Sequence, residues 1–85
     1  MSRATMSTAE KTLEVLAGVV RINAVRDNPD IRLYDQHILD SLGTLRLMVA
    51  LEEAFGVEVS TVEFEQEVWA TPRRIVEYME SVVGP

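Results

Sequence analysis

Residues 41–56, SLGTLRLMVALEEAFG, decide the fold, because they form the clearest helical pattern in the chain. Apolar residues recur there at helical spacing, and we expect them to form one broad apolar face: Leu42, Leu45, Met48, Val49, Leu51 and Phe55. Glu52 and Glu53 would face water. Gly56 stands where a glycine is typical of the left-handed C-terminal cap. The pattern therefore predicts a helix from Ser41 to Phe55.

The composition limits the function classes. A chain of 85 residues with 47% hydrophobic content can bury one core and form one small domain. No cysteine is present, which excludes disulfides and thiolate metal sites, so any thiol chemistry needs an imported thiol. The formal charge of -6 repels nucleic acid and favours basic partners. No apolar run reaches the roughly 20 residues of a membrane span, and the start lacks a signal-peptide core, so we expect a cytoplasmic protein that is not membrane-embedded.

The N-terminal part of the chain predicts a helix as well. Ser7 and Glu10 have the spacing of a capping box, and apolar residues follow at helical spacing: Leu13, Leu16, Ala17 and Val20. We expect this helix to end near Ile22. Residues 1–7 are mostly small and polar, so we expect a disordered N-terminus ahead of a domain at residues 8–85.

A third helix is predicted at the C-terminal end. Thr71 is suited to the N-cap and Pro72 to the first helical position, and Gly84 and Pro85 end the pattern. The side chains expected to point inward are Ile75, Val76, Met79, Val82 and Val83. Arg73 and Arg74, in the first turn, oppose the helix dipole, so either solubility or a partner explains them.

The segments between these helices are expected to be loops. Residues 27–30 are a turn cluster in which Pro29 forces Asn28 out of helical geometry. We interpret residues 23–40 as a long ordered loop pinned by its own apolar side chains: Ile31, Leu33, Tyr34, Ile38 and Leu39. A short helical turn is expected at about residues 62–67. The predicted fold is all-α, a small four-helix bundle with a long loop between helices one and two.

Asp40 and Ser41 place two side-chain oxygens at the start of the central helix. Either one can cap the helix by accepting a hydrogen bond from an unpaired backbone N–H, and capping explains many such serines. If Asp40 caps alone, the Ser41 hydroxyl stays free at the positive end of the helix dipole, where an attached phosphate would be stabilised. Gly43 costs the helix about 1 kcal/mol relative to alanine. One gain would be room beside Ser41 for a bulky group.

The sequences LDSLG (39–43) and LEEAFG (51–56) resemble those of acyl and peptidyl carrier proteins, and the resemblance covers nearly the whole chain. In that family an Asp-Ser-Leu motif starts the second helix, and a phosphopantetheinyl transferase attaches 4'-phosphopantetheine from coenzyme A to its serine. The resemblance implies that Ser41 is the attachment site, flanked by Asp40 and Leu42, in a fold of acyl-carrier-protein type. It implies a carrier of a thioester-bound acyl or aminoacyl group, not an enzyme, and the imported arm supplies the missing thiol.

Three short matches resemble the D-alanyl carrier subtype of that family: DSLGT (40–44), EF (63–64) and VWATP (68–72). Trp69 of the last match is expected to pack in the core. Two residues depart from the subtype, since Leu42 replaces an aromatic residue and Arg46 replaces an acid. Relatives of this subtype serve teichoic acid D-alanylation or natural-product (polyketide or nonribosomal peptide) biosynthesis, and both pathways stay open here.

The resemblance also implies partners. Carrier proteins present their second helix to other proteins, so we expect a docking surface that includes Arg46, Met48, Glu52 and Glu53. Leu42 and Met48 would be the apolar contacts near the arm. Besides the transferase, the implied partners are an adenylating enzyme and an acyltransferase or synthase. We expect a monomer, because a tether must visit several enzymes.

Other classes were weighed against the same residues. His37 and Ser41 are four residues apart with Asp35 nearby, but no strand-turn-helix elbow surrounds the serine, which argues against a hydrolase triad. Residues 27–38 lack the glycine and the glutamate of a calcium-binding EF-hand loop, so we expect no metal there. The alternative that remains is an unmodified helical adaptor that docks a basic partner through acidic residues: Glu52, Glu53, Glu63, Glu65 and Glu67.

Overall fold

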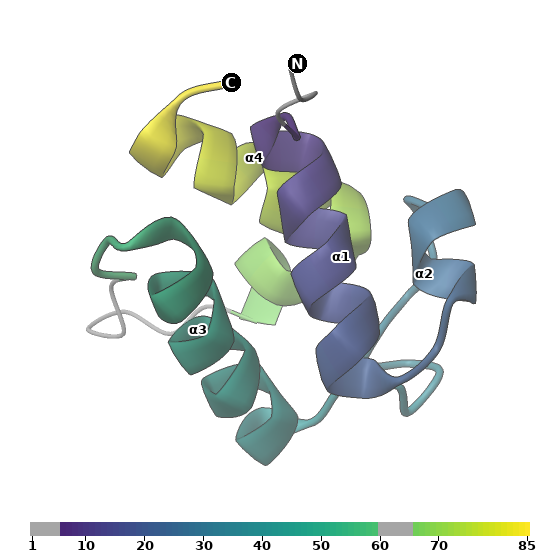
Figure 1. The fold of residues 1–85 in the computed structure, drawn as a ribbon. Helices are drawn as coiled ribbons and strands as arrows, with labels where there is room; N and C mark the ends of the chain where they lie inside the picture. Colours follow the sequence, from purple (N-terminus) through teal and green to yellow (C-terminus); the bar gives the residue numbers. More distant parts are fainter. Residues whose placement is uncertain (1–5, 60–65) are drawn as a thin grey trace.

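The computed structural model describes residues 6–59 and 66–85, and these residues are helical without any strand. The prediction of an all-α bundle is therefore confirmed. The helices in the described residues are α1 (Thr8–Val20), α2 (Ala24–Asp27), α3 (Ser41–Phe55), the 3-10 helix η1 (Gln66–Trp69) and α4 (Pro72–Val83). Figure 1 shows α1 crossing the middle of the bundle, with α3 and α4 packed against it.

The first helix begins as predicted and ends slightly earlier. Ser7 and Glu10 form the capping box, with Ser7 Oγ accepting the Glu10 N–H at 3.1 Å and Glu10 Oε1 accepting the Ser7 N–H at 3.0 Å. Arg21 ends the helix before Ile22, because it takes a left-handed conformation (φ 61°) and donates its N–H to the Ala17 carbonyl. Of the predicted disordered N-terminus, residues 1–5 lie outside the described part, whereas Ser7 belongs to the cap.

The segment predicted as one long loop contains a single helical turn, α2. Val25 in this turn is fully buried, so tertiary packing stabilises a helix that the local sequence of four residues does not predict. Asn28, which precedes Pro29, ends the turn and has a non-helical backbone (φ -130°, ψ 81°), as predicted for that residue. The rest is an ordered loop, since Leu33 is buried and its N–H donates to the Ala70 carbonyl at 2.9 Å.

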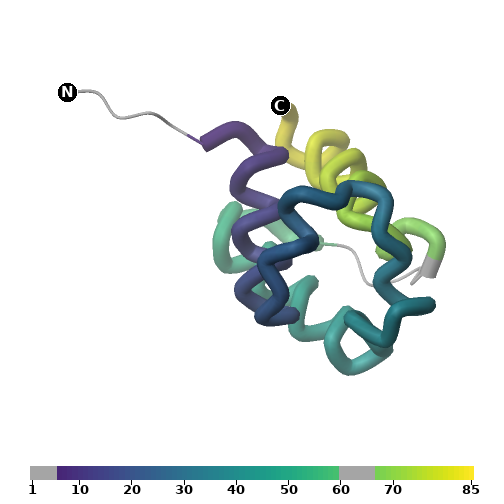
Figure 2. Tube along the Cα trace, turned by 90° about the vertical axis from the view of Figure 1, so that its right-hand side faces the viewer, coloured from purple at the N-terminus to yellow at the C-terminus, as the bar shows by residue number. Residues whose placement is uncertain are grey.

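The core of the described residues lies where α1, α3 and α4 meet. Its buried members come from every helix and from the loops: Leu16, Ala17, Val25, Leu33, Leu39, Leu47, Met48, Leu51, Val59, Trp69, Ile75 and Met79. Figure 2 shows the loop after α2 crossing over the bundle between α1 and the start of α3. This path brings the loop against the first turns of both α3 and α4.

The buried face of α3 differs from the predicted one. Leu47, Met48 and Leu51 are buried together with Thr44. Three residues of the predicted apolar face are exposed, and we call them the outward stripe: Leu42 (58% exposed), Leu45 (51%) and Val49 (53%). The prediction of one broad face was wrong because α3 is apolar on two faces, and helical periodicity alone does not show which face meets the core.

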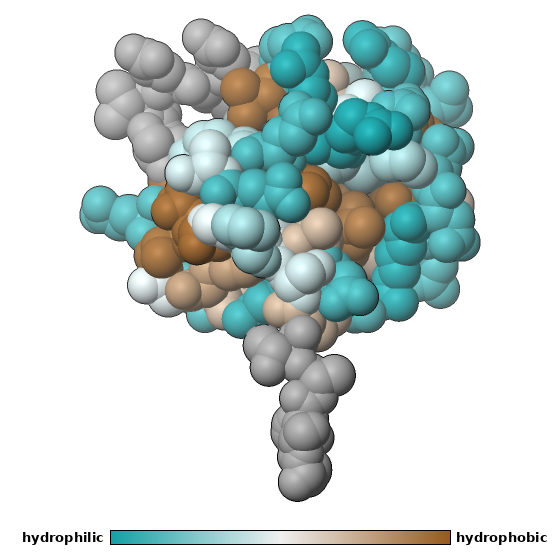
Figure 3. All heavy atoms as spheres, turned by 90° about the horizontal axis from the view of Figure 1, so that it is seen from above, coloured by the Kyte–Doolittle hydropathy of each residue, from teal (hydrophilic) through white to brown (hydrophobic). Residues whose placement is uncertain are grey.

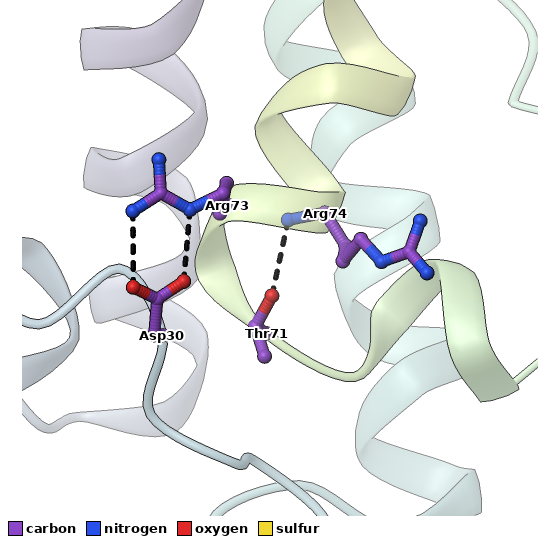
Figure 4. A network of polar contacts seen from close by, with 4 residues as sticks. All are labelled: Asp30, Thr71, Arg73 and Arg74. Atoms are coloured by element: carbon purple, nitrogen blue, oxygen red, sulfur yellow. Dashed lines mark hydrogen bonds and ion pairs between the residues drawn. The ribbon is translucent and has the colours of Figure 1, made fainter.

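The last helix begins with a cap and two ion pairs, and Figure 4 shows the cap and the pair of Arg73 with Asp30. Thr71 Oγ1 accepts the Arg74 N–H at 3.2 Å, as predicted for an N-cap. Arg73 binds both carboxylate oxygens of Asp30, at 2.8 and 3.0 Å, and Arg74 binds Glu67 at 2.8 Å. The two arginines therefore have partners inside the molecule, and they join the long loop and η1 to α4.

A short 3-10 helix before α4 overlaps the end of the predicted turn. Residues 62–65 of the predicted turn are outside the described residues, and the helix that the structure describes begins at Gln66. Trp69 at its end is 2% exposed, and its ring lies 5.5 Å from that of Tyr78 in a tilted arrangement. The expected packing role of Trp69 is confirmed. In α4, Ile75 and Met79 are buried as predicted, whereas Val82 is 39% exposed.

The two ends of the described chain are joined. Thr8 donates its N–H to the Pro85 carbonyl at 3.1 Å and its hydroxyl to the Gly84 carbonyl at 2.5 Å. Figures 1 and 2 both place this end of the bundle opposite the start of α3. Seen from this end, the surface is mainly hydrophilic with smaller hydrophobic areas (Figure 3). Within the described ranges, no helix is long and apolar enough to cross a membrane.

Candidate functional site

The start of α3 carries a capped helix end and a free hydroxyl. Asp40 has an extended backbone, and its Oδ1 accepts the Gly43 N–H at 2.7 Å, so Asp40 is the N-cap. Ser41 is then the first residue of the helix and is exposed. Among the described residues its hydroxyl has no hydrogen-bond partner. Of the two capping schemes open from the sequence, the one that leaves Ser41 free is present.

Gly43 serves the cap. A Cβ at this position would lie 3.1 Å from Asp40 Oδ1 and 3.3 Å from Leu39 Cδ1, closer than ordinary van der Waals contact. The space left by the missing side chain is therefore filled by the capping carboxylate and by Leu39. The expected gain, room for a bulky group beside Ser41, stays a prediction, and Gly43 is also one of the residues that line a hollow at this end of α3.

A buried hydroxyl pair holds the same turn of α3. Thr44 is fully buried and donates its hydroxyl to the Asp40 carbonyl at 2.8 Å. Its single proton is used there, so the Tyr34 hydroxyl, 2.5 Å away, donates to Thr44 Oγ1. Burial raises the pKa of Tyr34, which keeps the phenol protonated and able to donate at neutral pH. This pair joins the long loop to the backbone that carries Ser41.

In the prediction from the sequence Thr44 was only part of the DSLGT motif, and its hydrogen bonds with Tyr34 and Asp40 were not predicted. A local signal was available, because a threonine four residues after an N-cap can donate to the carbonyl of that residue. The partner Tyr34 was predicted only to pin the loop. Its position beside Thr44 depends on the path of the loop, which no local pattern reports.

The predicted docking residues divide into three groups. Leu42, Arg46 and Glu53 are exposed on α3. Met48 is 2% exposed and belongs to the core, so the prediction of a surface contact for Met48 was wrong; it lies on the α3 face that packs inward. Glu52 is half-buried, and its Oε2 accepts the Val59 N–H at 3.0 Å, so it acts in part within the molecule.

Two hollows adjoin this end of α3. The first, which we call the proximal hollow, has a volume of about 210 Å³ and lies between the end of α1, the loop and the start of α3, with walls that include Val19, Val20, Ile38, Asp40, Leu42 and Arg46. The second, the outer groove, is a shallow and mostly apolar groove along the exposed side of α3. Its volume is about 400 Å³, and it is lined by Leu45, Arg46, Val49, Ala50 and Glu53. Arg46 belongs to both.

Residues 10–79 match the family described as phosphopantetheine attachment site, which covers most of the chain. The chain belongs to this family. It is a carrier whose prosthetic group is 4'-phosphopantetheine, not an enzyme, and a carrier acts together with partner enzymes.

Three relatives are named D-alanyl carrier protein. The one from Bacillus velezensis is 44% identical over 71 residues, which are 84% of this chain and 91% of the relative. The one from Bacillus subtilis is 41% identical with the same coverage. The one from Staphylococcus xylosus is 35% identical over 77 residues, 91% of this chain and 99% of the relative. The resemblance stated from the sequence motifs is therefore confirmed.

The residues at the start of α3 fit the prosthetic group. The Ser41 hydroxyl is exposed and unengaged within the described residues, while the carboxylate next to it is occupied by the cap. Once attached, the group supplies a thiol, which this cysteine-free chain lacks.

Proposed function

We propose that Ser41 is the attachment residue and that the chain carries a D-alanyl group, as the names of its relatives suggest, in the D-alanylation of teichoic acids. Its partners would be a phosphopantetheinyl transferase, an adenylating enzyme that loads the amino acid as a thioester, and an acyltransferase that receives it. The observation that carries the proposal is the free hydroxyl of Ser41 beside an N-cap already supplied by Asp40.

The attachment step uses one oxygen of this chain. Ser41 Oγ bonds to the β-phosphorus of coenzyme A, the bond from that phosphorus to the oxygen leading to 3',5'-adenosine bisphosphate breaks, and the hydroxyl proton passes to a base of the transferase. Asp40 keeps the first turn of α3 formed, and the Tyr34–Thr44 pair fixes the backbone on which Ser41 stands. These residues position the nucleophile and do not take part in the bond changes.

Mass spectrometry tests the attachment residue. The protein is incubated with coenzyme A, magnesium and a broad-specificity transferase, and its intact mass is measured. The parent and Ser41→Ala are compared with Ser81→Ala, another exposed serine, on α4. We expect a gain of one phosphopantetheine on the parent and on Ser81→Ala, and none on Ser41→Ala.

The other outcomes of this experiment are also decisive. A gain on Ser41→Ala would mean that another residue is modified. No gain on any folded variant would favour the unmodified adaptor. The structure gives that adaptor little support, since Glu67 pairs with Arg74 and Glu52 bonds the Val59 N–H, while Glu63 and Glu65 lie outside the described residues.

We further propose that partners dock on the outward stripe, Leu42, Leu45 and Val49, with Arg46 and Glu53 at its side. Exposed apolar side chains aligned on one helix face are typical of a protein contact. Glu52 and Met48 are left out of this surface, because one is partly engaged within the molecule and the other is buried.

Loading kinetics test the docking surface. Val49→Ser and Arg46→Glu are loaded with D-alanine by the adenylating enzyme and ATP, and the control is Val82→Ser on α4, which is also partly exposed. We expect a higher KM for the two α3 variants, with an unchanged melting temperature, and parent-like kinetics for the control. Unchanged loading of both α3 variants would place the contact elsewhere. Faster loading with another amino or carboxylic acid than with D-alanine would favour natural-product biosynthesis.

A further inference from the structure

The proximal hollow lies beside the proposed attachment residue, which does not itself line it. The residues on either side of Ser41, Asp40 and Leu42, both line it. The opposite wall consists of Val19 and Val20 at the end of α1, which are half-buried and apolar. A group attached to Ser41 therefore begins at the rim of a hollow whose far wall is hydrocarbon.

One wall of the hollow is a cation, Arg46, that has no partner within the part of the chain that the structure describes. Arg26, Arg32, Arg73 and Arg74 each form an ion pair. Arg46 forms neither an ion pair nor a hydrogen bond with any residue that the structure describes. It lies four residues after Leu42 on the same face of α3, and helical side chains lean toward the helix N-terminus, which directs Arg46 toward the Ser41 end. The five-residue rise from Ser41 is about 7.5 Å, which an extended arginine side chain can span.

The size of the hollow limits what it can hold. Its volume of about 210 Å³ is below the roughly 300 to 1,000 Å³ of sites that enclose a whole ligand of drug size. It therefore suits only the part of a long chain that lies nearest to Ser41. In phosphopantetheine this part is a phosphodiester, which is anionic at neutral pH, followed by a carbon bearing two methyl groups. An anion next to hydrocarbon matches the arrangement of Arg46 beside Val19 and Val20.

We propose that the proximal hollow is the resting site of the arm on Ser41, with the phosphodiester paired to the Arg46 guanidinium and the two methyl groups against Val19, Val20 and Leu42. This inference rests on the proposed attachment at Ser41. The thiol end stays outside the hollow, within reach of partners. Because an exposed ion pair is weak, the arm leaves the hollow readily when a partner binds.

Arg46 then belongs to two surfaces, since it also lines the outer groove proposed for docking. A partner that presents a carboxylate to Arg46 would compete with the phosphodiester and release the arm. The same side chain would connect docking with extension of the arm, without a change in the fold.

Nuclear magnetic resonance of the modified protein tests the resting site. The holo form of each variant is prepared with the transferase, and one added phosphopantetheine is verified by intact mass. Methyl NOEs between the arm and the chain are measured with the ³¹P shift of the phosphodiester. Arg46→Gln is compared with Arg21→Gln, because Arg21 is also exposed and without an ion pair in the described residues, but does not line the hollow.

In the parent and in Arg21→Gln we expect NOEs from the arm methyl groups to Val19, Val20 and Leu42. In Arg46→Gln these NOEs should fall severalfold and the ³¹P shift should move toward that of free phosphopantetheine. Absent NOEs in the modified parent, or equal NOEs in Arg46→Gln, would overturn the resting site while leaving attachment intact. A protein that is not modified on Ser41 would overturn both proposals.

Discussion

The helices α3 and α4 both contain many apolar residues, yet they use them differently. In α4 the buried residues Ile75 and Met79 lie on one face, and the charged residue Glu77 is exposed. In α3 the buried face is accompanied by a second apolar face, the outward stripe, whose three side chains are each more than half exposed. The sequence of α4 is explained by folding alone. That of α3 contains more apolar surface than the core uses, which is typical of a helix that also contacts other molecules.

The first turns of the two helices are also held differently. That of α3 is fixed by the partly buried hydrogen bond of Tyr34 with Thr44, whereas that of α4 is fixed by the exposed ion pair of Arg73 with Asp30. A partly buried hydrogen bond between neutral groups is less sensitive to salt than an exposed ion pair, which is screened. The turn that carries Ser41 is thus the one whose geometry depends less on solution conditions.

The largest expected effect comes from truncating the buried faces. Leu51→Ala in α3 and Met79→Ala in α4 remove fully buried side chains, and each should lower the free energy of unfolding by about 2 to 5 kcal/mol. Urea denaturation followed by circular dichroism measures this. If Leu51→Ala were nearly neutral, the buried face of α3 would be assigned wrongly.

A smaller effect is expected from the buried contact at the start of α3. Tyr34→Phe removes the hydroxyl that donates to Thr44 and should cost about 0.5 to 1.5 kcal/mol in the free energy of unfolding. Thr44→Val also loses the bond to the Asp40 carbonyl and should cost more, while Thr44→Ser should recover most of the loss. If Thr44→Val were as stable as the parent, the hydrogen bonds of Thr44 would not stabilise the first turn of α3.

A weaker, pH-dependent effect is expected from the ion pair at the start of α4. The hydrogen bond from Arg73 lowers the pKa of Asp30, so the folded state has a pKa below the ordinary value of about 3.9. The pair therefore contributes stability above that value and loses it as the pH falls through the folded pKa. The stability difference between the parent and Asp30→Asn should be small at pH 7 and should shrink as the pH falls through the folded pKa of Asp30.

Denaturation midpoints of both proteins from pH 7 to pH 2 measure this difference. Repeating the series in about 1 M salt is the control, since screening should reduce the difference at pH 7. A difference that is constant across the whole pH range would show that Asp30→Asn acts through something other than charge.

The smallest effect on stability is expected from the outward stripe. The double variant Leu45→Ser, Val49→Ser changes two side chains that are more than half exposed, so its free energy of unfolding should stay within about 0.5 kcal/mol of the parent. Thermal and urea unfolding measure it. A loss comparable to that of Leu51→Ala would mean that the stripe serves folding, and the difference between α3 and α4 would disappear.

The elements predicted correctly are those with local signals. Each of the three long helices begins directly after a residue whose side chain caps it: Ser7, Asp40 and Thr71. A few adjacent residues of the sequence are therefore enough to predict where α1, α3 and α4 begin. The turn α2 was missed because Asn23 makes no side-chain cap and the burial of Val25 is a tertiary effect.

The site was predicted unevenly for the same reason. Ser41 follows from a motif of adjacent residues and from family membership. Met48 was misplaced because either face of an apolar helix satisfies the periodicity, and the choice is made by packing against α1. The contact of Tyr34 with Thr44 spans ten residues of irregular loop, so no repeating pattern in the sequence reports it.

The bonds from Thr8 to Gly84 and Pro85 have a practical consequence for handling the protein. They gather both ends of the described chain at one pole of the bundle, and Ser41 lies at the other (Figure 1). A molecule immobilised on a sensor surface through either end would present the Ser41 pole to the solution. With one fluorophore at a chain end and another on the arm, the efficiency of energy transfer between them would measure how far the arm extends from the bundle.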